Sequence, residues 1–445
     1  MNVKKLSPAQ WLFTIYLAAA ALSSVLLYLP FSHQPGVEIR YLDALFTAVS
    51  AISVTGLTVV NTADTFSPIG IFFLMLMFQF GGVGFMTLGT FLWIATGQRI
   101  GIQRRQMIML DQNRLDLAGL VRLIRDILFL SLAIELLGAL ILGTYFYFSY
   151  SYGVEAFLYG LFSSISAFTN AGFDIFGNSL GNFADDYLVQ MVHMFLMIAG
   201  AIGFPVLVET KEWYTSTNRH NFRFSLYTKI TVSTYFLLLF LGTVALWLLE
   251  SQHFYADKSG TEAFFYSLFN SATSRSTGLS TMDIQDYSLP SQLFLSLLMF
   301  IGASPSSVGG GVRTTTLAVV VLAIYGYARG NRHIRVFRRQ LLDEDIRKAS
   351  VVFATGVLLV ALAIGAVAIT QPHHSLMNII FEVTSAFGTC GLSMGLTPDL
   401  STAGKISIMV LMFMGRIGIL VLLFLLRKQT PPETYHFPRE RVIIG

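Results

Sequence analysis

Residues 46–57 read FTAVSAISVTGL, and related segments recur at residues 162–173 (FSSISAFTNAGF), 268–279 (LFNSATSRSTGL) and 381–392 (FEVTSAFGTCGL). Each segment is a stretch of small and apolar residues that ends in one glycine followed by Leu or Phe. These glycines are Gly56, Gly172, Gly278 and Gly391, at intervals of 106 to 116 residues. A unit that recurs at a regular interval indicates a repeat architecture. We expect four units around one axis, with the functional groups on that axis.

The composition is typical of a membrane protein. Hydrophobic residues make up 54% of the 445 residues and charged residues only 12%, whereas soluble chains carry about 25% charged residues. A membrane helix needs roughly 20 apolar residues, and residues 11–31 form the first such run. Further runs are centred near residues 80, 135, 195, 240, 297, 360 and 415. We therefore expect eight transmembrane helices, two in each repeat.

The repeats divide the chain into four units of one integral membrane domain. We place repeat 1 at residues 1–110, repeat 2 at 111–220, repeat 3 at 221–340, and repeat 4 with the C-terminal tail at 341–445. In each unit an outer helix, the small-residue segment and an inner helix follow one another. The predicted fold class is an all-α membrane protein, with four pseudo-symmetric helix–re-entrant pore loop–helix repeats around a central pore.

The distribution of charge predicts the orientation in the membrane. Basic residues gather at the N-terminus and in segments 99–125, 211–229, 329–348 and 427–441, whereas the alternate connections are richer in acids such as Asp185 and Asp186. Because Lys and Arg concentrate on the cytoplasmic side, both termini should be cytoplasmic. The opposite face is net negative. That charge either reflects insertion bias alone or attracts cations to a pore mouth.

Several kinds of chemistry are excluded by missing residues. Cys390 is the only cysteine, so the chain forms no intrachain disulfide and no cysteine-based metal site. Gly404-Lys405 is followed by Ile406 and has no glycine five positions upstream, so the chain carries no Walker A motif. We expect no nucleotide site in this chain, no nucleic-acid partner and no enzymatic activity.

The small-residue segments are too short to cross a hydrocarbon layer of about 30 Å as helices. We expect each to enter as a short helix and to return as extended chain, which is tolerated at membrane depth only around a water-filled or protein-lined axis. Glycine reaches positive φ without steric penalty, so successive carbonyls can face the axis and replace the hydration shell of a monovalent cation. The alternative is that glycines and small residues only allow close helix packing. The expected filter residues are Val54, Thr55, Gly56, Asn170, Ala171, Gly172, Ser276, Thr277, Gly278, Thr389, Cys390 and Gly391.

A second set of glycines aligns 24 to 28 residues after the first, in the inner helices: Gly81, Gly200, Gly302 and Gly415. Only in the third repeat do we expect the helix to break there, because proline and glycines follow. That segment is either a movable gate below the filter or a fixed kink filled by its neighbours, and we favour the gate. The expected gate residues are Gly302, Ala303, Ser304, Pro305, Ser306, Ser307, Val308, Gly309, Gly310, Gly311, Arg313 and Arg416.

Arg416 directly follows the fourth inner-helix glycine, in the middle of an apolar span. A charged residue in a membrane is costly and indicates a function and a partner. We expect Arg416 to hydrogen-bond carbonyls or serines of the gate segment and to repel cations when the gate is closed. Arg313 either belongs to the same site or reaches the inner surface by snorkelling.

Three other charges fall within the expected membrane segments. Glu135 lies in an outer helix, and either a buried ion pair or a role in conduction would explain it. Glu382 and Arg275 belong to the short helices, and we interpret both as scaffolding behind the filter.

These features resemble the Ktr/Trk/HKT potassium transporters, and most of all the KtrB-like membrane subunits of the bacterial Ktr system. The resemblance rests on the four units, one filter glycine in each, the break in the third inner helix, and motifs such as VTGL, NAGF and GTCGL. It covers nearly the whole chain. It implies potassium as the transported ion, because Gly56 stands where sodium-preferring members of the family have serine. Ser276-Thr277-Gly278 departs from the threonine, alanine and glycine frequent in relatives, which should not alter selectivity if the ligands are backbone carbonyls.

The resemblance also implies partners and a location. It predicts a homodimer in the bacterial cell membrane, multi-pass, with one pore in each protomer. The dimer would sit on a cytosolic ring of nucleotide-binding RCK subunits (KtrA-like). The basic segment 329–348 offers such a ring a docking surface, although most charge runs are only solvated. Packing at the dimer interface would explain the apolar tail at residues 442–445.

Two further functions remain as alternatives to uncoupled potassium conduction. The first is Na⁺- or H⁺-coupled potassium symport, or a role for sodium as an activator. It needs titratable groups along the pore, and beyond Glu135 and His193 there are few. The second is an intramembrane enzyme, which would need paired acids or His and Glu ligands within the spans. No such cluster occurs in the sequence.

Overall fold

The computed structural model describes residues 7–84, 120–331 and 333–426, with six isolated positions between and beyond these ranges. Part of the basic segment 99–125 and residues 442, 444 and 445 of the apolar tail lie outside the described residues. The interpretations of these two segments therefore stay predictions.

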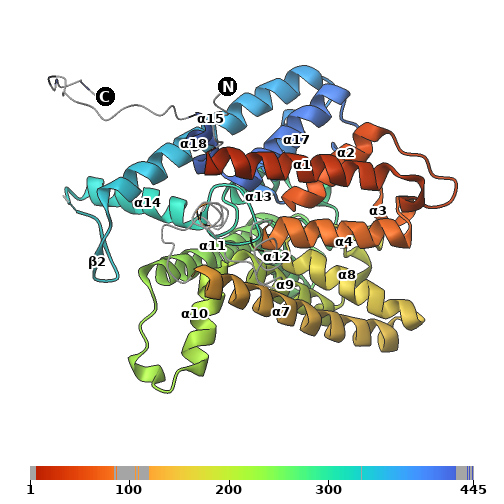
Figure 1. The fold of residues 1–445 in the computed structure, drawn as a ribbon, viewed down its shortest axis with the longest axis horizontal. Coiled ribbons are helices and arrows are strands. Elements are labelled where there is room, and N and C mark those ends of the chain that lie inside the picture. The colour runs from red at the N-terminus through yellow and green to blue at the C-terminus, as the bar shows by residue number, and fades with distance from the viewer. Residues whose placement is uncertain are drawn as a thin grey trace, which may run out of the picture.

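The described residues are organised as a long helix, a short helix and an inner segment in each quarter of the chain (Figure 1). The first quarter contains α1 (Pro8–Tyr28), η1 (Pro30–Ser32), α2 (Tyr41–Ser53), α3 (Thr62–Thr65) and α4 (Pro68–Val83). The second contains α7 (Leu120–Ser149), η2 (Gly153–Glu155), α8 (Ala156–Phe168), η3 (Gly181–Phe183), α9 (Tyr187–Ala201) and α10 (Phe204–Thr215). The boundaries between repeats stay a prediction.

The third quarter contains η4 (Arg219–Asn221), α11 (Leu226–Glu250), α12 (Gly260–Thr273), η5 (Ile284–Asp286), α13 (Leu289–Phe300) and α14 (Thr314–Ala328). A small antiparallel hairpin follows, with β1 (Arg335–Val336) and β2 (Arg339–Gln340). The last quarter contains α15 (Asp343–Thr370), α16 (Leu376–Gly388), α17 (Thr402–Ile417) and α18 (Ile419–Leu426). In Figure 1 the hairpin extends from the left of the helical body, whereas α3 lies at its right.

The long helices have the length and surface of membrane spans. Among the described residues four helices, α1, α7, α11 and α15, are long and apolar enough to cross a membrane. Their outer faces expose large apolar side chains, such as Phe129 and Leu136 on α7 and Leu248 on α11. Exposed apolar patches of this kind mark contact with a membrane or another protein. The structure is thus a mainly helical membrane fold, and the count of eight spans stays a prediction.

The four short helices are α2, α8, α12 and α16, with 13 or 14 residues each. At 1.5 Å per residue such a helix spans only about 20 Å, less than the hydrocarbon thickness of about 30 Å. Each ends a few residues before its filter glycine, so its C-terminal carbonyls lie next to the filter segment. This agrees with the short helix expected from the sequence.

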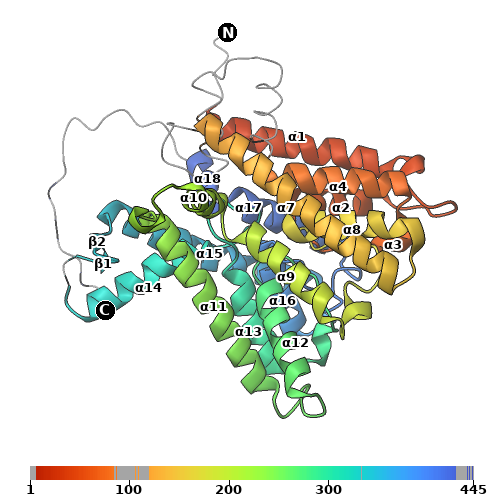
Figure 2. The ribbon, with the colours of Figure 1, turned by 90° about the horizontal axis from the view of Figure 1, so that it is seen from below.

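Contacts between helices close the four units into a ring. Each long helix packs on the short helix of its own unit, as α1 does on α2 and α7 on α8. Each short helix also packs on the inner segment of the preceding unit: α8 on α4, α12 on α9, and α16 on α13. The first short helix, α2, completes the circle by packing on α17 of the fourth unit. In Figure 2, α1, α2 and α4 of the first unit lie toward the top, and α11, α12 and α13 of the third unit toward the bottom.

The inner segments correct one expectation from the sequence. A break was expected in the third unit alone, but α9 and α10 meet at an angle of 102°, and α17 and α18 at 98°. The cause is a second glycine, three residues after the first, at Gly203 (φ +105°) and Gly418 (φ +90°). A right-handed helix cannot continue through a positive φ. In the third unit Pro305 occupies the corresponding position and a longer loop follows.

An ion pair joins the first and fourth units. Lys405, in the first turn of α17, donates from Nζ to Asp43 Oδ1 of α2 at 2.7 Å, and both side chains are largely buried. We predict that a double-mutant cycle of Lys405→Met and Asp43→Asn gives a coupling of about 1 kcal/mol in the free energy of unfolding. Denaturant titration of the purified protein in detergent measures it. The same cycle on the exposed pair Lys348–Glu344, also at 2.7 Å, should give much less. Equal couplings would contradict a role for the first pair in closing the ring.

Candidate functional site

The four filter segments share an unusual backbone. In each, the residue two positions before the glycine has positive φ, at Val54 (+49°), Asn170 (+53°), Ser276 (+113°) and Thr389 (+49°). The glycines themselves have φ between +72° and +94°. Alternation of left-handed and ordinary residues lets successive carbonyls face the same side of the chain, instead of alternating as in a strand.

The glycines meet in a closed ring. A methyl group added to Gly172 would lie 2.1 Å from the carbonyl oxygen of Thr277, and one added to Gly278 would lie 2.2 Å from that of Cys390. One on Gly391 would lie 2.1 Å from the Thr55 oxygen. One on Gly56 would lie 2.8 Å from the Ala171 oxygen. Each glycine therefore faces the carbonyl of the next unit, and the fourth faces the first. Of the expected filter residues, Thr55, Ala171, Thr277 and Cys390 thus lie against the four glycines, and side-chain hydrogen bonds join Ser276 to Thr389 and Thr277 to Asn170.

Buried hydroxyl groups support each segment from behind. Ser50 Oγ accepts from the Gly56 amide at 3.1 Å, and Ser385 Oγ accepts from the Gly391 amide at 3.0 Å. In the other two units the hydroxyl donates instead, Ser166 to the Phe173 carbonyl (2.6 Å) and Thr273 to the Leu279 carbonyl (2.7 Å). Sequence reasoning did not single out these four residues. The signal was present, because a serine precedes the glycine by six positions in three of the four segments.

The gate segment lies directly beside the filter and is largely buried. Its backbone folds back on itself, with Ala303 N donating to the Gly310 carbonyl at 3.3 Å. It also bonds the bend of the second unit, where Ser304 N donates to Ala201 O (3.0 Å) and Val308 N to Gly200 O (3.2 Å). The break expected from the sequence at residues 302–311 is therefore present, and it is held by hydrogen bonds to a neighbouring unit.

Arg416 joins this segment to the first unit. Its side chain is 7% exposed. Nη1 donates to the carbonyls of Val308 and Gly309, and Nη2 donates to those of Gly81 and Gly82 at the end of α4. The first two partners were expected from the sequence. The second two were not, because nothing local in the chain shows that α4 ends there.

Arg313 folds back onto the same segment. Its Nη1 donates to the carbonyls of Ser304 and Gly309, so the two arginines share the Gly309 oxygen. These contacts hold the guanidinium on the loop rather than in the snorkelling position that was the other alternative, and the role of Arg313 in a gate stays a prediction.

The other buried charges lie outside the ring. Glu135 accepts from the amide of Gln79 with both oxygens, at 3.2 and 2.9 Å, so its partner is an amide and not the base that an ion pair would need. Glu382 accepts from Ser393 at 3.0 Å. Arg275 is fully buried, and within the part of the chain that the structure describes its guanidinium nitrogens have no hydrogen-bond partner. Among the described residues, no three His, Cys, Asp or Glu side chains lie close enough to hold a metal ion.

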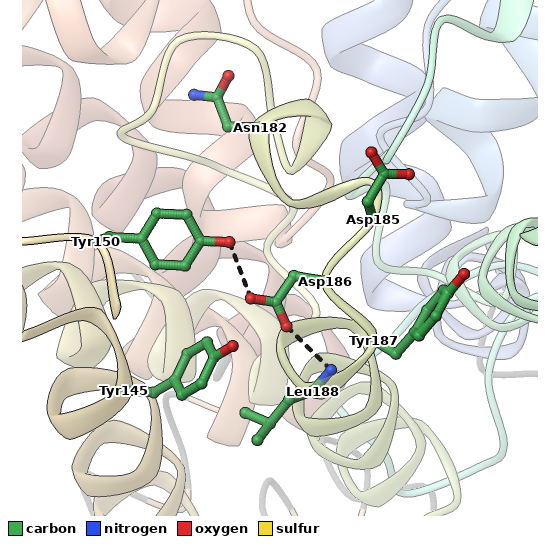
Figure 3. Close-up of a pocket in the computed structure, with 7 residues that line it drawn as sticks. All are labelled: Tyr145, Tyr150, Asn182, Asp185, Asp186, Tyr187 and Leu188. Atoms are coloured by element: carbon green, nitrogen blue, oxygen red, sulfur yellow. Dashed lines mark hydrogen bonds between the residues drawn. The ribbon is translucent and has the colours of Figure 1, made fainter. Parts of the chain in front are cut away.

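A pocket of about 460 Å³ opens on the expected outer face, lined by Tyr145, Tyr150, Asn182, Asp185, Asp186, Tyr187 and Leu188 (Figure 3). Asp186 is already engaged there, because it accepts from the Tyr150 hydroxyl at 2.9 Å and caps α9 through the Leu188 amide at 3.1 Å. Burial and this carboxylate raise the pKa of Tyr150 above its ordinary value, which keeps the hydroxyl protonated as a donor. Asp186 therefore serves to stabilise the loop junction at this pocket.

Comparison with known proteins gives consistent matches over the whole chain. The sequence profile of the TrkH family, described as "Cation transport protein", matches residues 17–436. The Ktr system potassium uptake protein D of Bacillus subtilis (strain 168) is 52% identical over 443 residues, which covers 100% of this chain and 98% of the relative. The Ktr system potassium uptake protein B of the same organism is 35% identical, covering 99% and 97%.

Two more relatives extend the comparison. The potassium/sodium uptake protein NtpJ of Enterococcus hirae is 32% identical over 99% of this chain and 98% of its own. The crystal structure of the potassium transporter TrkH from Vibrio parahaemolyticus superimposes with a TM-score of 0.75, covering 96% of this chain and 86% of that one. At 20% identity this last match shows a shared fold.

The closed ring of glycines predicts that a side chain at Gly391 destabilises the protein by a steric collision, in addition to the penalty for its backbone conformation. Gly391→Ala should lower the apparent melting temperature of the purified protein far more than Gly36→Ala. Both positions have positive φ, at +94° and +83°, so both variants share the penalty for a left-handed alanine. Only Gly391 adds a collision, because the space around Gly36 is open. Overpacking costs about 1–3 kcal/mol. Equal losses for the two variants would contradict the ring.

Proposed function

The chain belongs to the TrkH family of cation transport proteins, and from this premise we propose that it takes up potassium ions through the filter ring. The observation that carries the proposal is the closed circle in which each filter glycine faces a carbonyl of the next unit. The family resemblance inferred from the sequence is confirmed. The chain is accordingly a membrane transport protein and not an enzyme.

Potassium as the transported ion is supported by the relatives and by the chemistry of the ring. Both Bacillus subtilis relatives are named as potassium uptake proteins. A ring of backbone carbonyls can replace the hydration shell of a potassium ion. In addition, the C-terminal ends of the four short helices carry partial negative charge and lie next to the ring, which favours a cation there.

Conduction down the electrochemical gradient needs no further energy source. A membrane potential supplies about 2.3 kcal/mol for each elementary charge per 100 mV. None of the twelve filter residues carries a carboxylate or an imidazole that would couple a proton. Glu135 is occupied by Gln79. Sodium-coupled uptake remains the second candidate, and the name of the potassium/sodium uptake protein NtpJ favours it.

The loop at residues 302–313 acts as the gate in this proposal. Its backbone is buried beside the filter, and Arg416 and Arg313 place two positive charges on its carbonyls. Charges of this sign repel a cation that leaves the filter. Opening requires the loop to release the carbonyls that Arg416 holds.

Assembly is the part of the proposal that rests on the resemblance. We infer a homodimer and a cytosolic nucleotide-binding RCK ring as partner. The β1–β2 hairpin supports a docking role, because it presents Arg335, Arg338 and Arg339 at an exposed turn. A surface of this charge fits an acidic partner.

The filter assignment predicts the effect of a side chain at Gly56. Gly56→Ser should lower the K⁺/Na⁺ uptake ratio severalfold, because the Cβ would lie 2.8 Å from the Ala171 carbonyl and displace it from the ring. Ion uptake in cells that lack their own potassium transporters measures the ratio. Gly36→Ser, in open space, serves as the control. An unchanged ratio at equal protein level would remove Gly56 from the filter.

The gate assignment predicts that Arg416→Ala raises uptake. Hydrogen bonds to charged groups are worth roughly 1.5–3 kcal/mol each, so release of the loop should increase potassium flux about tenfold or more. Flux into proteoliposomes measures this, with Arg122→Ala as the control because that side chain is 76% exposed. An unaltered flux with intact protein would show that Arg416 does not hold the gate closed.

A further inference from the structure

Ser276 lies at the contact between the filter and the gate segment. Its side chain is fully buried. Its Oγ accepts a hydrogen bond from the Gly310 amide at 3.3 Å and donates one to the Thr389 carbonyl at 3.0 Å. One hydroxyl group therefore connects the gate segment with the filter segments of both the third and the fourth units.

The gate segment fits closely against this hydroxyl. A methyl group on Gly309 would lie 2.3 Å from Ser276 Oγ, and one on Gly310 would lie 2.5 Å from Thr389 Oγ1. The glycines are thus required where the backbone of the gate segment approaches the filter. Movement of this segment cannot leave Ser276 unaffected, because the contact is direct.

The other hydroxyls behind the filter differ from Ser276 in their partners. The bonds of Ser50, Ser166, Thr273 and Ser385 described above all stay within one unit. Those bonds hold the shape of a filter segment. The bonds of Ser276 instead link a segment that is proposed to move to a carbonyl that is proposed to bind the ion.

We propose that Ser276 couples the gate to ion selectivity, as a positioning residue that acts through the Thr389 carbonyl. This rests on the proposed function. Chains of hydrogen bonds polarise one another, so the Gly310 amide strengthens the donation from Ser276 to Thr389 while the gate is closed. A carbonyl that accepts such a bond has less negative charge to offer a cation. When the gate opens, the Gly310 bond is lost and the Thr389 carbonyl becomes a stronger ligand.

The coupling is reciprocal. If opening strengthens cation binding at the Thr389 carbonyl, a cation bound there must favour the open gate by the same factor. A potassium ion bound at the Thr389 carbonyl then favours the opening of the gate through which it leaves the filter.

Flux and selectivity measured together test the proposal. Potassium and sodium flux into proteoliposomes would be measured for the full chain and for Ser276→Ala, Ser276→Thr and Ser166→Ala. Ser276→Ala should raise potassium flux about two- to tenfold, the shift expected from loss of one net hydrogen bond. It should also lower the K⁺/Na⁺ ratio at least about twofold, since a stronger carbonyl field favours the smaller ion. Ser276→Thr keeps the hydroxyl at a position where a β-branched residue is strained (φ +113°), so it should lower the melting temperature but keep the K⁺/Na⁺ ratio closer to that of the unaltered protein than Ser276→Ala does.

A control variant, Ser166→Ala, and a double variant of Ser276→Ala with Arg416→Ala complete the test. Ser166→Ala removes a hydroxyl that supports the filter without touching the gate, so the ratio should change without a rise in flux. In an Arg416→Ala background the gate is already released, and Ser276→Ala should raise flux by less than it does alone. If Ser276→Ala does not reach the membrane, Ser276→Cys, with a weak donor of similar size, should change both quantities in the same direction.

Each contrary outcome has a distinct meaning. A rise in flux with an unchanged ratio would make Ser276 a simple latch, and a changed ratio without a rise in flux would make it a filter support. Either result overturns the coupling, as would Ser276→Thr behaving like Ser276→Ala. No cation flux by the unaltered chain, alone or with a cytosolic nucleotide-binding partner, would instead overturn the proposed function, and the coupling with it.

Discussion

The structure depends on one constraint, which is the need to place non-helical backbone in the middle of a membrane protein. In hydrocarbon an unpaired amide or carbonyl costs several kcal/mol, so extended chain is tolerated only where protein or water satisfies it. Four filter segments meet at one place, where each glycine leaves room for a carbonyl of the next unit to approach closely. Buried serines and a threonine bond the remaining backbone groups. The short and inner helices then follow as the supports that hold four segments at one axis.

The same constraint explains Arg416. The inner segments of the first and third units both end regular helix near the axis, which leaves carbonyls without intrahelical donors. A guanidinium group carries five donors in a planar fork and cannot lose its charge. Arg416 donates to carbonyls of α4 and of the gate segment at once. A lysine would carry the charge but could not bridge two pairs of carbonyls in the same way. The cost of a buried charge is thus offset by backbone groups that need donors.

Much of this arrangement could be predicted from the sequence, because the signals were local and repeated. The four glycines and the short lengths of the small-residue segments indicated the short helices, and the run after Gly302 indicated the gate segment. The bends at Gly203 and Gly418 were missed, since hydrophobicity alone does not distinguish a straight apolar helix from a bent one. The partners of Arg416 on α4 and of Glu135 on Gln79 were missed because they depend on which units become neighbours. Neighbour relations arise from the closed ring, and no single segment encodes them.

The inner segment of the third unit differs from those of the other units. The inner segments of the second and fourth units bend at a single glycine of positive φ, Gly203 and Gly418. In the third unit Pro305 replaces that glycine, and the chain needs a longer path before α14 begins at Thr314. The loop that results bonds to two other units: the second through Gly200 and Ala201, and the fourth through Gly415 and Arg416. Arg416 extends that contact to the first unit. In the proposed gate, one movement of this loop would break its bonds to the second and the fourth units together.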